Sequence, residues 1–140
     1  MEYKSRRLAG ILLIVLPTVA YGGVSLLYLL ISAEDGYTNN PLRQDLWRAG
    51  HAHAGVLLIL SLVILRYVDE AALSPIMKQL VRHGVPLSAI IIPAAFFLSV
   101  LDPGATEPNA WIYLAYLGFG ILTFTFLVLG IGLVKKSPNP

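Results

Sequence analysis

Two histidines, His51 and His53, lie in a run of small and apolar residues, and Arg48 precedes them. Neutral imidazole ligates haem iron, copper and zinc, and arginine pairs well with carboxylates such as haem propionates. Successive residues of an α-helix are turned by about 100°, so residues two apart point to nearly opposite sides. A single ion therefore cannot easily take both histidines from one helix, and two separate sites on opposite faces are favoured.

The residues around the two histidines leave room beside the helix. They are Gly50, Ala52, Ala54 and Gly55. Such small side chains make space for a flat, bulky group or for a neighbouring helix. Haem requires strong axial ligands, an apolar pocket and a donor for its propionates. We therefore predict a haem site in which His51 and His53 ligate iron and Arg48 contacts the propionates.

Less specific roles compete with this interpretation. Histidines near a membrane interface can form hydrogen bonds with water or headgroups, and an arginine at a membrane edge usually contacts headgroups. No set of nucleophile, histidine and carboxylate can be assembled, and no glycine-rich phosphate loop is present. The sequence therefore predicts no catalytic residue.

The composition is that of a membrane protein. Apolar residues make up 56% of the 140 residues and charged residues 13%, and the mean hydropathy is +0.72. A soluble domain is about a quarter charged. Cysteine is absent, which excludes disulfides, thiolate metal sites and covalent c-type haem attachment. The net charge of +2 is too small to indicate nucleic-acid binding.

Four apolar segments predict an all-α, four-helix membrane bundle that forms one domain over residues 1–140. The predicted spans are 8–32, 49–68, 85–101 and 110–134, each close to the roughly 20 residues that cross a bilayer. Asn40 and Pro41 are typical of a helix start, so the second helix is expected to run from Pro41 to about Glu70. The stretch 77–83 is expected to lie along the membrane surface, with His83 facing solvent or headgroups.

Basic residues predict the orientation. They flank both ends of the chain and the connection between the second and third spans: Lys4, Arg6, Arg7, Arg66, Lys78, Arg82, Lys135 and Lys136. The positive-inside rule then places both termini in the cytoplasm, in a multi-pass protein of the cell membrane. Trp47 and Trp111 are expected at the outer interface, and His51 and His53 in the outer leaflet.

The motif Gly50-His51-Ala52-His53 on an inward-running helix resembles the HxH stretch in the catalytic subunit of haem–copper oxidases and nitric oxide reductases. In that superfamily the two histidines face opposite ways and ligate two haems. Those subunits contain three arcs of four helices. The resemblance implies haem ligation by His51 and His53, and a trimer of this four-helix chain. It does not extend to an adjacent histidine pair for copper.

Three functions remain open at this point. The first is a haem-binding membrane protein that works as a homo-oligomer in electron transfer or gas chemistry. The second is a copper or zinc site formed by His51 and His53 from several subunits at the outer face. The third is an accessory or scaffold subunit without chemistry of its own.

Overall fold

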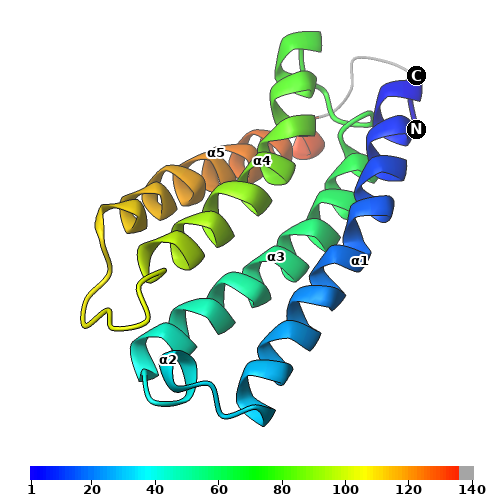
Figure 1. Ribbon diagram of the computed structural model, residues 1–140. Helices are drawn as coiled ribbons and strands as arrows, with labels where there is room; N and C mark the ends of the chain where they lie inside the picture. The colour runs from blue at the N-terminus through cyan, green and yellow to red at the C-terminus, as the bar shows by residue number, and fades with distance from the viewer. Residues whose placement is uncertain (136–140) are drawn as a thin grey trace.

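The computed structural model describes residues 1–135, and Lys136 of the predicted C-terminal basic pair lies outside them. The long helices are α1 (Tyr3–Ile31), α3 (Pro41–Tyr67), α4 (Pro75–Ser99) and α5 (Leu114–Val134), which continues a 3₁₀ turn, η1 (Ala110–Tyr113). A short helix, α2 (Asp35–Thr38), connects α1 to α3 (Figure 1). Four helical segments are long and apolar enough to cross a membrane. The predicted all-α, four-helix membrane fold is confirmed.

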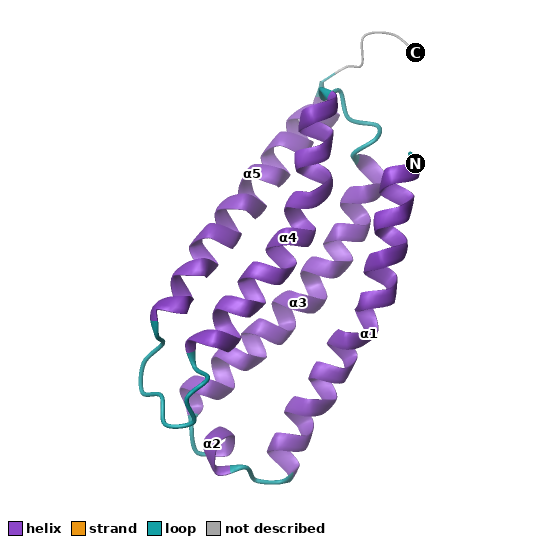
Figure 2. Cartoon of the chain, turned by 45° about the horizontal axis from the view of Figure 1, so that its top comes forward, coloured by secondary structure: helices purple, strands orange, loops and turns teal. Residues whose placement is uncertain are grey.

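The four long helices lie in a row. Going across the row, α1 packs on α3, α3 on α4, and α4 on α5 (Figure 2). The core therefore lies along the two central helices, where Leu65, Val85 and Ile92 are fully buried. The outer helices keep wide apolar faces, as shown by Ile14 at 79% exposure on α1 and Leu127 at 61% on α5. Such faces suit lipid or a partner helix.

The start of α3 is as the sequence predicts. The side chain of Asn40 accepts a hydrogen bond from the backbone N–H of Arg43 at 3.1 Å, and Pro41 occupies the first turn. The helix ends at Tyr67, slightly before the expected end at Glu70.

The start of α4 differs from the prediction. The helix begins at Pro75 rather than Val85, and the stretch 77–83 forms its first turns instead of a separate surface segment. Ser74 caps it by accepting a hydrogen bond from the N–H of Met77. The charges of Lys78 and Arg82 interrupt the apolar run, which hid this cap from a hydropathy argument. His83 is exposed, as expected.

Two of the four glycines of α5 allow a close approach, Gly118 to α4 and Gly132 to the segment that connects α3 to α4. A Cβ atom at Gly118 would lie 2.5 Å from Ile92, and one at Gly132 would lie 2.6 Å from Leu73. Gly120 and Gly130 face open space instead. Close backbone approach of this kind is the usual means of packing helices in a bilayer, where no hydrophobic force draws apolar surfaces together.

Arg43 ties the connecting segments together at the α2 end of the bundle. Its guanidinium donates hydrogen bonds to the carbonyl oxygens of Val100 at 3.0 Å, Gly36 at 2.8 Å and Leu101 at 3.1 Å. It also lies over the ring of Trp47, 4.1 Å from the ring centroid. Trp47 is therefore half-buried beneath Arg43 rather than a free interfacial anchor. This contact fixes the end of α4 against the start of α3.

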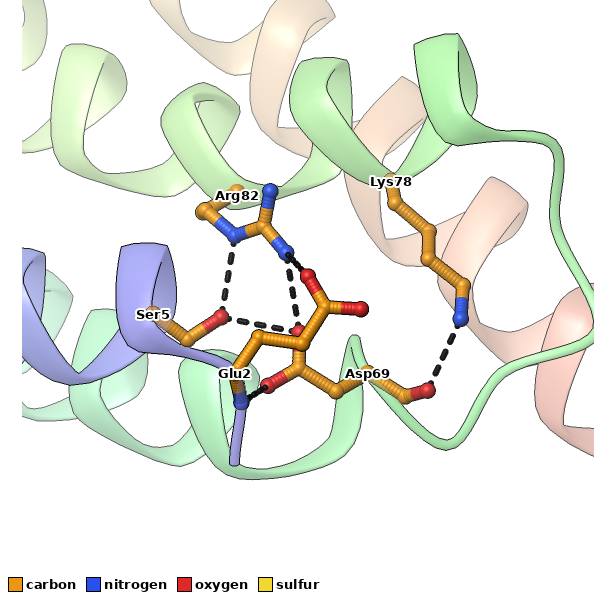
Figure 3. A network of polar contacts seen from close by, with 5 residues as sticks. All are labelled: Glu2, Ser5, Asp69, Lys78 and Arg82. Atoms are coloured by element: carbon orange, nitrogen blue, oxygen red, sulfur yellow. Dashed lines mark hydrogen bonds and ion pairs between the residues drawn. The ribbon is translucent and has the colours of Figure 1, made fainter.

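A buried ion network ties the opposite end (Figure 3). Arg82, only 2% exposed, pairs with Asp69 at 2.9 Å and with Glu2 at 3.1 Å, and donates to the hydroxyl of Ser5 at 2.9 Å. Lys78 donates to the backbone carbonyl of Asp69 at 2.8 Å. Arg82 was expected in a connecting loop, but it lies inside α4 and joins α4 to α1 and to the α3–α4 turn.

The carboxyl group of Asp69 has a lowered pKa. Burial alone would raise it, but the backbone N–H of Glu2 donates a hydrogen bond to the carboxylate, and Arg82 and Ser5 add further hydrogen bonds. Together with the positive charge of Arg82, these contacts hold the pKa of Asp69 below the ordinary value of 3.8. The folded protein thus favours the charged carboxylate.

We expect Arg82→Met to lower the free energy of unfolding by about 3–5 kcal/mol, since it leaves the buried Asp69 carboxylate without its charge partner. Unfolding of the purified chain in detergent micelles, followed by circular dichroism, measures the change. The control is Arg66→Met, whose partner Glu70 lies on the exposed surface. It should change stability by less than about 1 kcal/mol. Equal effects would contradict a structural role for Arg82.

Stability should also depend on pH through Asp69. Because folding lowers the pKa of this group, its contribution is fully present well above 3.8 and is lost as pH falls through the lowered pKa. Unfolding measured over a series of acidic pH values should show this loss in the wild type. Asp69→Asn should remove that part of the pH dependence, while Glu70→Gln should retain it.

Candidate functional site

His53 is held in one orientation by its own helix. Its Nδ1 atom lies 2.7 Å from the carbonyl oxygen of Ala49, one turn earlier in α3. A carbonyl oxygen only accepts, so Nδ1 carries the hydrogen and Nε2 of the neutral ring keeps its lone pair. Histidines that ligate metals commonly show this arrangement, because the second-shell hydrogen bond fixes both tautomer and ring orientation.

The walls of the His53 site are aromatic and come from two other helices. The imidazole lies 5.3 Å from the ring of Phe96 in α4 and 5.6 Å, edge-on, from that of Phe119 in α5, measured between centroids. Sequence reasoning identified neither phenylalanine. Both lie in apolar runs where nothing distinguishes them from packing residues, and only the crossing of the helices brings them to His53.

His51 points toward α1 and occupies the space left by two glycines. A Cβ atom at Gly23 would lie 3.1 Å from its Nε2 atom, and one at Gly22 would lie 3.5 Å from its Nδ1 atom. Because these two glycines have no side chains, the His51 imidazole can lie directly against the α1 backbone. The glycine pair is visible in the sequence, but the sequence does not show that it contacts His51.

The two imidazoles therefore lie against different helices, His51 on α1 and His53 on α4 and α5. Within residues 1–135, no group of three or more histidine, aspartate or glutamate side chains is placed to hold a metal ion. One chain thus offers a single imidazole to each face of α3.

Arg48 lies on the exposed surface of α3. Its guanidinium donates to the side-chain oxygen of Gln44 at 2.7 Å, and Gln44 in turn donates to the carbonyl oxygens of Tyr37 and Thr38, both at 2.9 Å. Residues three apart share a side of a helix, so Arg48 lies on the same side as His51 rather than His53. No carboxylate pairs with Arg48 in the described part of the chain, which leaves its charge available to an anion.

Two donors near this end have no hydrogen-bond partner in the described residues. They are the hydroxyl group of Tyr37, a fully buried residue, and the indole N–H of Trp47. The two rings lie 5.8 Å apart, and Trp47 also lies 6.1 Å from Phe97. Both residues belong to the packing around Arg43, which lies over the Trp47 ring.

Both imidazoles are packed against neighbouring helices. His53 is oriented for ligation, but Phe96 and Phe119 lie in contact with its ring. At His51 the α1 backbone lies directly against the ring. A macrocycle would fit beside either imidazole only after these helices move apart. Comparison with protein-family models, curated proteins and solved structures gave no significant match. Function is therefore inferred from this geometry and from the histidine motif.

The position of His51 against α1 can be tested with a matched pair of alanine substitutions. Gly22→Ala places its Cβ at ordinary contact distance, while Gly23→Ala crowds the imidazole. We expect Gly23→Ala to shift the ring ¹⁵N resonances of His51 more than Gly22→Ala does. Replacing glycine by alanine inside a helix stabilises it by about 0.5–1 kcal/mol. In Gly23→Ala the crowding against His51 should offset part of this gain. Equal shifts in both variants would place His51 elsewhere.

Proposed function

We propose that this chain is a haem-binding membrane protein in which His51 and His53 ligate iron, working as a homo-oligomer in electron transfer or gas chemistry. The observation that carries the proposal is the geometry of His53. Its Nδ1 is tied to the Ala49 carbonyl at 2.7 Å, and its ring lies between Phe96 and Phe119. An imidazole oriented in an apolar, aromatic setting is what a haem protein requires.

The oligomer follows from the number and direction of the ligands. Each face of α3 carries one histidine, and bis-histidine ligation on either face needs a second copy. The open row of helices supports this, because α1 and α5 keep large apolar faces that a neighbouring copy could cover. A trimer would have the three-arc organisation implied by the resemblance to haem–copper oxidases.

The remaining residues have supporting roles in this proposal. Arg48, on the His51 side, pairs with a propionate at that face. With both termini in the cytoplasm, the histidines lie in the outer leaflet of the cell membrane. Bound haem supplies the one-electron or gas-binding chemistry, and the chain supplies ligands, orientation and an apolar setting. The structure gives no reason to name a substrate.

The visible spectrum tests the proposal. Protein purified from haem-replete cells, or supplied with haemin, should show a Soret band. His53→Ala should weaken haem binding by more than about tenfold. Losing even a second-shell partner of a metal ligand typically costs about 10–100-fold in affinity, and this substitution removes the ligand itself. His51→Ala should alter the spectrum or the haem content as well. The control is His83→Ala, because this histidine is exposed on α4, away from both faces.

Other outcomes would replace the proposal. If wild-type protein stays colourless with added haemin, haem binding is wrong. Elemental analysis that finds copper or zinc in the wild type, and loses it in His51→Ala and His53→Ala, would indicate a shared metal site at the outer face. If all three variants match the wild type in both measurements, the chain is an accessory subunit without its own cofactor.

A further inference from the structure

A large apolar groove lies between α4 and α5, away from both histidines of α3. Its volume is about 810 Å³, and it is lined by Leu80, Gly84 and Leu87 of α4 and by Tyr116, Gly120 and Phe124 of α5, among others. Gly120 lacks the side chain that would fill it, whereas Gly84 packs against Thr125 of α5. A Cβ atom at Gly120 would meet nothing within 4 Å. No side chain of the described residues fills the groove at Gly120.

A second, basic hollow adjoins the first. It lies between α1 and α4, has a volume of about 420 Å³, and is lined by Lys4, Arg7 and Arg82. Gln79 and His83 line both hollows. The two hollows therefore adjoin at these two side chains of α4, with the positive charge on the side of the chain's N-terminus.

The positive charge of this hollow comes from Lys4 and Arg7. Arg82 is already compensated by Asp69 and Glu2 (Figure 3). Lys4 and Arg7 are exposed and form no ion pair within residues 1–135. An anion beside them would therefore meet two cations that no carboxylate of the described chain pairs with directly, although Glu2 lies near Lys4.

The dimensions of the groove match one leaflet of a membrane. From Tyr116 to Phe124 the wall formed by α5 rises about 12 Å at 1.5 Å per residue. Half of the hydrocarbon core measures about 15 Å. An occupant of this groove with its charged end at Lys4 and Arg7 would span most of one leaflet.

We propose that the two hollows together bind one anionic phospholipid. Its phosphate lies at Lys4, Arg7 and Gln79, and an acyl chain runs along Gly84, Gly120 and Phe124. An anionic phospholipid joins an anion to a long apolar chain in this order. The basic end is also the end that the positive-inside rule assigns to the anionic cytoplasmic leaflet.

Native mass spectrometry of the full chain, in micelles with equal parts phosphatidylglycerol and phosphatidylcholine, tests this site. The wild type should retain phosphatidylglycerol preferentially. Arg7→Gln should lower the ratio of the two retained lipids about fivefold, the effect of one basic residue near an anionic headgroup. The control Arg6→Gln removes the same charge from the same terminus. Arg6 lies over the ring of Tyr3 rather than in the hollow, so the ratio should not change.

The groove is tested separately by filling it. Gly120→Leu should reduce retention of both lipids, while Gly10→Leu, at another glycine that faces open space, should not. Equal losses in Arg6→Gln and Arg7→Gln would show only diffuse attraction and overturn the site. Unchanged retention in Gly120→Leu would also overturn it. If Gly120→Leu instead lowers the oligomeric mass, the groove is an interface between copies. Displacement of the lipid signal by inorganic phosphate would likewise contradict a lipid site.

Discussion

The buried ion pair between Arg82 and Asp69 sets the arrangement on which the rest of the structure depends. Charges are tolerated in such surroundings only when they are paired and hydrogen-bonded. Satisfying Arg82 therefore draws together the start of α1, the α3–α4 turn and α4. At the other end of the bundle, Arg43 holds the end of α4 and the α2 segment against α3 through hydrogen bonds to Val100 and Gly36. Between these two points the helices are held by van der Waals packing, and glycines allow the close backbone approach that this packing requires.

Sequence reasoning predicted what depends on a single helix. Composition and length predicted the number of spans, and the local pattern at Asn40 predicted the start of α3, because a cap involves neighbours in the chain. Helical geometry likewise predicted that His51 and His53 point apart. These features follow from short-range chemistry alone, and the structure agrees with each of them.

Features that depend on which helices meet could not be predicted. Arg82 looked like a loop charge because its carboxylate partner is distant in the chain, and Phe96 looked like any packing residue. The contact between Gly23 and His51 likewise cannot be predicted without knowing how α1 crosses α3. Periodicity reports which side of a helix is apolar, but it does not report which residue of a partner lies opposite.

The two histidines differ in how much they rely on their surroundings. His53 is oriented by Ala49 of its own helix and walled by α4 and α5, so its site persists as long as the central packing does. His51 depends on α1, the helix with the least buried span and with neighbours along one side only. Displacing α1 would expose the His51 imidazole without disturbing His53. A neighbouring helix that competed for the apolar face of α1 would therefore change the surroundings of His51 and leave those of His53 unchanged.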